Sequence, residues 1–122
     1  MEMKRIERSV SIHPYFKIHP GKLDAVKALL REFVAKAATE ENCVWYEFTI
    51  NGDEVFCREA YLGADGALAH LDNVGAELDQ MMKLTTLSRL EIHGPAKELE
   101  KLKAPLGPLK PAWFVYECGV ER

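Results

Sequence analysis

Alternating apolar and polar positions predict a β-hairpin in the middle of the chain. Two runs, 43–50 and 54–62, are rich in β-branched and aromatic residues and are separated by Asn51-Gly52-Asp53. Asn-Gly and Gly-Asp pairs accept the positive φ that tight hairpin turns need. Side chains alternate between the two faces of a strand. One face of the hairpin is therefore predicted to lie in the core, and it carries Val44, Tyr46, Phe48, Ile50, Val55, Cys57, Glu59 and Tyr61.

The other face of the hairpin, called here the mixed face, combines aromatic and charged side chains. It carries Trp45, Glu47, Thr49, Phe56, Arg58 and Ala60. A turn on Gly52-Asp53 sets Glu47 directly opposite Arg58, which is a favourable cross-strand pair. The face is too aromatic to stand in water and too charged for a monomer core, so we expect something to cover it.

The same periodicity predicts the remaining elements. They are a strand over Ser9–Ile18, a helix over about Lys22–Ala38, a second helix after Asp65, a strand over Thr86–His93, a short charged helix over Ala96–Lys103 and a strand over Trp113–Cys118. Pro14 cannot donate to a β-ladder, so it indicates a bulge or a locally unpaired position in the first strand. Gly75 is expected to divide the second helix in two.

The order strand, helix, strand, strand, helix, strand is the split βαβ pattern of the ferredoxin-like α+β fold. Right-handed crossovers place both long helices on one side of the sheet. The bare side would expose an apolar group comprising Tyr15, Trp45, Phe56 and Leu87. Its three rings alone present on the order of 500 Å², near the upper limit for a patch on a monomer. We therefore expect a homodimer in which two sheets pack face to face as a dimeric α+β barrel.

Composition narrows the class of protein further. The 122 residues suit a single domain, and a net charge of −3 with scattered basic residues predicts no nucleic-acid or acidic-membrane partner. There is neither an apolar leader nor a run approaching the ~20 apolar residues of a membrane span, so we expect a cytoplasmic protein. The three cysteines lack metal-ligand spacing. They are expected to be reduced core residues, with no metal site.

Four segments resemble the antibiotic biosynthesis monooxygenase (ABM) superfamily. They are Pro20-Gly21-Lys22, Trp45-Tyr46-Glu47-Phe48, Phe56-Cys57-Arg58-Glu59-Ala60-Tyr61 and Ala67-Leu68-Ala69-His70-Leu71. The resemblance spans roughly Val10 to Leu90 and implies the same dimeric barrel. Members of that superfamily include small oxygenases that use neither metal nor flavin on phenols and hydroquinones, and also haem-degrading proteins.

Two departures from the superfamily pattern matter. Haem-degrading members carry an asparagine in the first strand, near the position of Pro14 in this chain. They carry a further histidine in the second helix, near the position of Gln80. The resemblance therefore does not extend to haem degradation. Residues 94–122 are a C-terminal helix and strand added to the minimal pattern.

A first candidate site joins Glu59, on the core face of the hairpin, to His70 at the edge of the second helix's apolar stripe. A buried carboxyl group must be paired and hydrogen-bonded. Tyr46 across the ladder and His70 above are the expected partners. Either the group simply ties helix to sheet, or Glu59 fixes the tautomer of His70 and raises its basicity for proton abstraction.

A second candidate site lies on the mixed face. It gathers polar and aromatic side chains from four strands, namely His13, Tyr15, Trp45, Glu47, Arg58, Arg89, Glu91 and His93. A few convergent polar groups among aromatic rings are typical of a small-molecule pocket. The alternative is that the charges form interface ion pairs that fix the register of the dimer.

Two functions remain open. The first is a cofactor-independent monooxygenase of the quinol or anthrone type, in which His70 or His13 acts as base while Tyr15 and Trp45 hold an aromatic substrate. It would need no metal, flavin or haem. The second is a non-catalytic dimeric barrel that binds a small aromatic ligand or serves as an assembly module.

Overall fold

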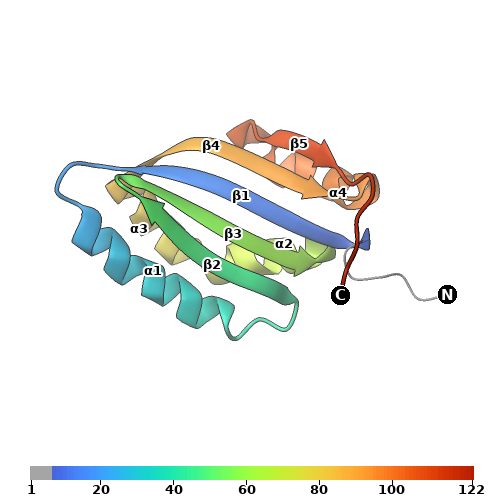
Figure 1. Cartoon of the computed structure of the whole chain (residues 1–122), viewed down its shortest axis with the longest axis horizontal. Helices are drawn as coiled ribbons and strands as arrows, with labels where there is room; N and C mark the ends of the chain where they lie inside the picture. The colour runs from blue at the N-terminus through green and yellow to red at the C-terminus, as the bar shows by residue number, and fades with distance from the viewer. Residues whose placement is uncertain (1–6) are drawn as a thin grey trace.

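The chain forms one five-stranded sheet with its helices packed against one face (Figure 1). The computed structural model describes residues 7–122. Its strands are β1 (Ser9–Ile18), β2 (Cys43–Asn51), β3 (Glu54–Leu62), β4 (Thr85–Gly94) and β5 (Ala112–Val115), in the spatial order β2-β3-β1-β4-β5. Its helices are α1 (Leu23–Ala37), α2 (Gly63–Asn73), α3 (Gly75–Leu84) and α4 (Ala96–Leu106), followed by a 3-10 turn, η2 (Gly107–Leu109). The predicted ferredoxin-like α+β arrangement is confirmed.

The central hairpin has the predicted turn and register. Gly52 adopts a positive φ of 60°, and Glu47 pairs with Arg58 across the ladder. The core face of β3 is buried, including Glu59, which pairs with Tyr46. The expectation for Val44 is wrong, because an irregularity between Cys43 and Trp45 puts Cys43 opposite Tyr61 and against the core.

Pro14 lies at a position where the ladder between β1 and β3 is interrupted, so its missing N–H removes no hydrogen bond to β3. The ladder between β1 and β3 runs from Ser9 to Ile12 and resumes at Tyr15, so Pro14 falls in the interval. The predicted lack of pairing therefore holds on the β3 side, while on the other side of β1 Pro14 lies opposite Leu90 of β4.

A bulge in β4 corrects the expected position of Leu87. Tyr15 pairs with Arg89 while Phe16 pairs with Leu87, so Ser88 is an extra residue in the ladder. The bulge changes the face on which the preceding side chains lie. Leu87 consequently packs against the helix-side core instead of joining the exposed aromatic group.

Two groups of buried side chains lie between the sheet and the helices. One lies under α2 and α4 and includes Tyr61 and Leu99, and the other lies under α1 and α3 and includes Phe33 and Met81. The predicted break is present, since α2 ends at Asn73 and α3 begins at Gly75. Within residues 7–122, no helix is long and apolar enough to cross a membrane.

The C-terminal segment folds back on its own chain. Helix α4 continues through Pro105 to Leu106, beyond the expected end at Lys103, and β5 is shorter than the expected Trp113–Cys118. Strand β5 pairs in parallel with β4 of the same chain. The Glu98 carboxylate of α4 accepts a hydrogen bond from the Ala64 backbone N–H at 2.9 Å, so it caps α2 from a distance.

Candidate functional site

A cavity of about 230 Å³ lies between the sheet and the helices. One buried water needs only about 10–15 Å³ of such space, and protein interiors are otherwise close-packed, so this is no ordinary packing defect. Its walls come from both groups of core residues and are almost wholly aliphatic or aromatic. The polar side chains that reach it are Tyr46, Cys57, Glu59 and His70.

Glu59 brings a carboxyl group into this apolar space. Its position on the core face of β3 leaves it only 4% exposed. The Tyr61 hydroxyl, two residues along the same face, donates a hydrogen bond to Glu59 Oε1 at 2.5 Å. Burial raises the pKa of Glu59 to about 7, against the opposing effect of the Tyr61 hydrogen bond. A carboxyl group that titrates near neutral pH can both accept and donate a proton there.

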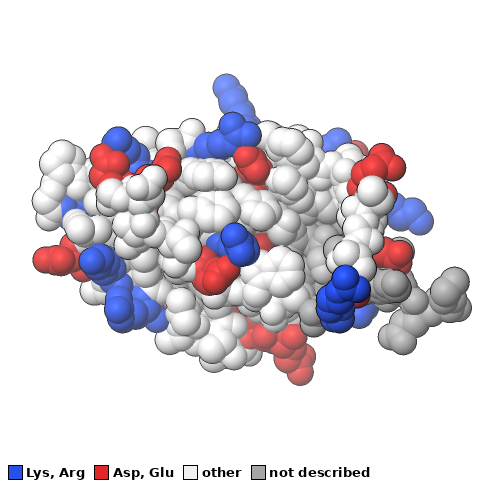
Figure 2. All heavy atoms as spheres, viewed as in Figure 1, with Lys and Arg blue, Asp and Glu red and all other residues white. Residues whose placement is uncertain are grey.

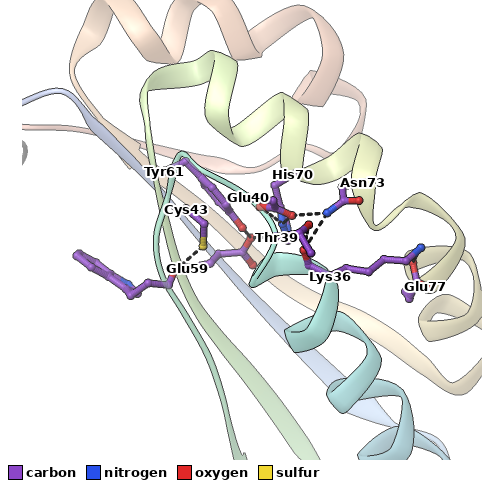
Figure 3. A network of polar contacts seen from close by, with 10 residues as sticks. Lys36, Thr39, Glu40, Cys43, Glu59, Tyr61, His70, Asn73 and Glu77 are labelled. Atoms are coloured by element: carbon purple, nitrogen blue, oxygen red, sulfur yellow. Dashed lines mark hydrogen bonds and ion pairs between the residues drawn. The ribbon is translucent and has the colours of Figure 1, made fainter.

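His70 descends from α2 and faces Glu59 (Figure 3). It is 2% exposed, and its Nε2 atom lies 3.5 Å from Glu59 Oε1. Its Nδ1 lies 3.0 and 2.9 Å from the two Glu40 carboxylate oxygens. Since a carboxylate only accepts, Nδ1 carries the proton and the neutral ring presents the Nε2 lone pair to Glu59. Burial lowers the pKa of His70, while the hydrogen bond to Glu40 acts in the opposite direction.

Asn73 holds Glu40 in place. Its side-chain amide donates to Glu40 Oε2 at 2.8 Å and to the Lys36 carbonyl at 3.1 Å. Asn73 follows His70 by three residues on α2, so both side chains lie on the helix face that meets the turn after α1. Figure 3 shows the resulting chain of contacts, from Tyr61 and Glu59 through His70 to Glu40 and Asn73.

The structure brings together the predicted pair, His70 and Glu59, and adds partners that the sequence reasoning did not assign. Tyr61, rather than Tyr46, bonds Glu59, and Glu40, rather than Glu59, fixes the His70 tautomer. The place of Tyr61 two residues after Glu59 was a usable signal, because period two sets both on one face. Glu40 carried no such signal, since it lies in a turn.

Replacing Glu40 with glutamine should lower the pKa of His70 further, because the amide removes the charge that favours the imidazolium. The pKa can be followed through the His70 ring signals in an NMR titration. Glu41→Gln is the matched control, because Glu41 is the exposed neighbour in the same turn. Equal His70 titration curves in the two variants would mean that Glu40 does not act on the ring.

The remaining predicted site residues, apart from Tyr46, lie on the opposite, mixed face of the sheet. His13 bonds Ser11 Oγ at 2.8 Å and contacts the His93 ring edge-on, with 4.6 Å between ring centroids. Burial and the nearby His93 lower the pKa of His13. The Tyr15 and Phe56 rings are in contact at 4.7 Å, and Trp45 is 45% exposed. The sheet therefore separates His13 from His70.

Charged residues of the mixed face pair with one another. Arg58 lies 3.3 Å from Glu47, and Glu91 accepts hydrogen bonds from Arg89 at 2.5 Å and from His93 at 3.1 Å. The bonds from His93 and Arg89 lower the pKa of Glu91. Figure 2 views this face and shows a largely uncharged middle, apart from an adjoining acidic and basic group. These charges are therefore paired within the chain, and both the pocket and the interface interpretation of this face stay predictions.

The cavity arrangement suits acid–base chemistry on an apolar molecule. A carboxyl group and an imidazole lie 3.5 Å apart there, close enough to pass a proton between them after a small movement. A perturbed ionisable pair in an apolar pocket is the usual mark of a functional site. No cluster of three or more His, Cys, Asp or Glu side chains in the described part of the chain is placed to hold a metal ion.

Comparison with known proteins finds solved structures at different degrees of similarity. No protein-family model and no curated protein matches the sequence. The solved structure of MupZ from Pseudomonas fluorescens is 38% identical, covers 94% of this chain and 95% of its own, and superposes with a TM-score of 0.90. A proposed antibiotic biosynthesis monooxygenase from Nitrosomonas europaea is 15% identical over 79% of this chain and 96% of its own, with a TM-score of 0.66. Another, from Caulobacter crescentus, is 19% identical over 72% and 90%, with a TM-score of 0.64. The last two likenesses concern the fold alone.

Proposed function

This chain belongs to the family of MupZ from Pseudomonas fluorescens, and we propose that it is a cofactor-independent monooxygenase of the antibiotic biosynthesis monooxygenase superfamily, acting on a small aromatic molecule in the cavity. The substrate would be of the quinol or anthrone type. The observation that carries the proposal is Glu59, a carboxyl group with its pKa raised to about 7 beside His70 in an apolar space. An ionisable pair is costly to bury, so its presence in an apolar pocket supports a chemical role over simple binding of an apolar ligand.

The proposed reaction begins with proton removal. Glu59, in its carboxylate form, takes a proton from an acidic C–H or O–H of the substrate. The resulting anion passes one electron to dioxygen, and the radical pair combines to form a C–O bond. The proton held by Glu59 then goes to the peroxide, a second C–H proton is lost, and the O–O bond breaks to release water. For an anthrone the balance is CH₂ + O₂ → C=O + H₂O.

His70 and its partners support this step. Its Nε2 lone pair faces Glu59 and shares the proton that Glu59 takes up, and Glu40 stabilises the imidazolium that then forms. The apolar walls leave little water to compete for the proton, which strengthens each electrostatic interaction in the cavity. His13 has no part in this mechanism, because its ring lies on the other face of the sheet, against Phe56 and His93.

Oxygen uptake tests the proposal. We expect the protein to consume one dioxygen per molecule of a hydroquinone or anthrone in chelator-treated buffer, without added flavin or haem. Mass spectrometry of the product under ¹⁸O₂ should show one labelled oxygen. Absence of uptake across a panel of hydroquinones and anthrones would contradict the monooxygenase.

The protonated form of Glu59 supports a second candidate function. Below its pKa of about 7 this group is an acid in an apolar pocket, so the site can also serve a redox-neutral proton transfer such as an isomerisation. Exchange of the acidic C–H of anthrone for deuterium, measured in D₂O under nitrogen, tests the proton transfer that both candidates share, and oxygen uptake in air separates them. Exchange without oxygen uptake would favour the redox-neutral reaction.

We further propose that the mixed face is buried in a homodimer. Trp45→Asp should then convert a dimer of twice 13.8 kDa into a monomer or an aggregate, because it places a charge in an apolar contact. Val34→Asp is the matched control, since Val34 is 44% exposed, as Trp45 is 45%, but lies on α1. Light scattering reads the mass. A wild-type mass of 13.8 kDa at micromolar concentration would contradict the dimer.

A further inference from the structure

The cavity reaches solvent over β4, between α3 and η2. Met82 of α3 and Leu109 of η2 both line it, and they are 46% and 55% exposed. Below them Leu87 and Leu90 of β4 line the cavity and are half-buried. Helices α3 and α4 pack over opposite ends of β4 (Figure 1). The exposed lining residues therefore mark an entrance between α3 and η2, the turn that follows α4.

The ionisable pair lies away from this entrance. Glu59 is on β3, two strand positions from β4 in the order β3-β1-β4. Neighbouring strands are about 4.8 Å apart, so this separation is roughly 10 Å across the sheet. Glu59 and His70 are almost fully buried, in contrast to Met82 and Leu109. A molecule that enters over β4 must therefore pass along an apolar floor before it meets the carboxyl group.

The lining offers an anion nothing to pair with. Among the described residues that line the cavity there is no lysine or arginine, and the one carboxyl group is Glu59. A carboxylate or phosphate placed there would lose its hydration without gaining a counter-charge. An uncharged ring with one hydroxyl or acidic C–H meets no such penalty, because its polar end reaches Glu59 and His70.

We propose that the site selects an uncharged, mainly apolar substrate through this entrance, and that Leu109 sets the size that can pass. The proposal rests on the proposed function only in taking the cavity as the place where the substrate binds. Leu109 lies beyond Leu90, in the C-terminal addition to the superfamily pattern. The selection would therefore be a property of chains that carry this addition.

The surroundings of Leu109 are fixed, which makes its side chain the variable part of the entrance. The start of α4 is tied to α2 by the bond from Ala64 N–H to Glu98, and Leu102 and Leu106 of α4 are buried in the core. After η2, Lys110 adopts a left-handed conformation with φ 53°, which turns the chain away toward β5. A larger side chain at position 109 would therefore narrow the entrance without moving the helix.

Binding of two matched probes tests the charge selection. At pH 7 we expect wild-type protein to bind 2-naphthol at least about 100-fold more tightly than 2-naphthoate, because only the latter carries a buried charge. Isothermal titration gives both affinities. Equal affinities, or tighter binding of 2-naphthoate, would overturn the inference.

Tryptophan at the entrance tests the size selection. Leu109→Trp should weaken 2-naphthol binding by about 10-fold, whereas Leu23→Trp, an exposed leucine at the start of α1 outside this cavity, should not. Circular dichroism confirms that both variants fold. If the two variants bind 2-naphthol alike, Leu109 is not the determinant. Leu109→Ala provides a second variant, and it should admit anthrone at least as well as wild type.

This experiment fails separately from the proposed function. Binding of 2-naphthol needs no turnover, so the predicted affinities in a protein that consumes no oxygen would support the inference and contradict the monooxygenase. Oxygen uptake with an unchanged KM for anthrone in Leu109→Trp would support the monooxygenase and contradict the inference about Leu109. Where uptake occurs, Leu109→Trp should raise KM and leave kcat unchanged.

Discussion

Glu59→Gln should lower kcat by about 10² to 10⁴-fold, the usual contribution of one positioned general base. Glutamine keeps the size of the side chain and accepts the Tyr61 hydrogen bond, so the cavity retains its shape. The wild-type rate should rise with pH through about 7, as Glu59 loses its proton. The rate of the variant should not show this rise with pH. Steady-state oxygen uptake between pH 5 and 9 measures both effects.

Glu47→Gln is the control for this change. Glu47 is on the same hairpin but points to the mixed face, where it pairs with Arg58 at 3.3 Å. Its replacement should leave the pH dependence of kcat unaltered. A Glu59→Gln enzyme that retained full activity and the rise through pH 7 would assign the base to another residue, with His70 the next to test.

The hairpin explains why half of the site could be predicted from sequence. Strict alternation and a two-residue turn on Gly52-Asp53 fixed the register, and that register placed Glu59 inward. A charged side chain on an otherwise apolar face stands out in any such pattern. Helical periodicity then placed His70 above it, and both expectations agree with the structure.

The other half depends on features that periodicity does not contain. The bulge at Ser88 shifts Leu87 to the helix side, and nothing in a period-two pattern announces an extra residue. Glu40 reaches His70 from a turn, where side-chain direction follows from backbone detail. The cavity itself is a space that the side chains leave unfilled, and a list of apolar positions predicts only that they are buried.

The mixed face illustrates a limit of reasoning from composition. Its histidines, arginines and aromatic rings have the composition of a pocket. The charged groups nevertheless pair with one another at the surface, and Arg89 and His93 both donate to Glu91. The perturbed carboxyl group appeared instead where apolar residues dominate. Where many polar residues gather, charged side chains find partners. An ionisable group that is isolated among apolar residues instead has a shifted pKa, because burial disfavours its charged form.

Glu59→Gln should also make the protein more stable above pH 7. The folded state raises the pKa of Glu59 from 4.5 to about 7, so between these values folded protein keeps a proton that unfolded protein has released. Each unit of this interval costs the wild type about 1.36 kcal/mol of unfolding free energy as pH rises. The loss therefore reaches roughly 3 kcal/mol by pH 7 to 8, and it is absent below pH 4.5.

Glutamine has no proton to lose, so the free-energy difference between variant and wild type should widen by about 3 kcal/mol from pH 4.5 to pH 8. Urea melts across this range measure it. His70 is present in both proteins, so the comparison isolates the effect of the Glu59 carboxyl group. A difference that stays constant with pH would mean that folding does not raise the pKa of Glu59, and the carboxyl group would then lack the property that suits it to catalysis at neutral pH.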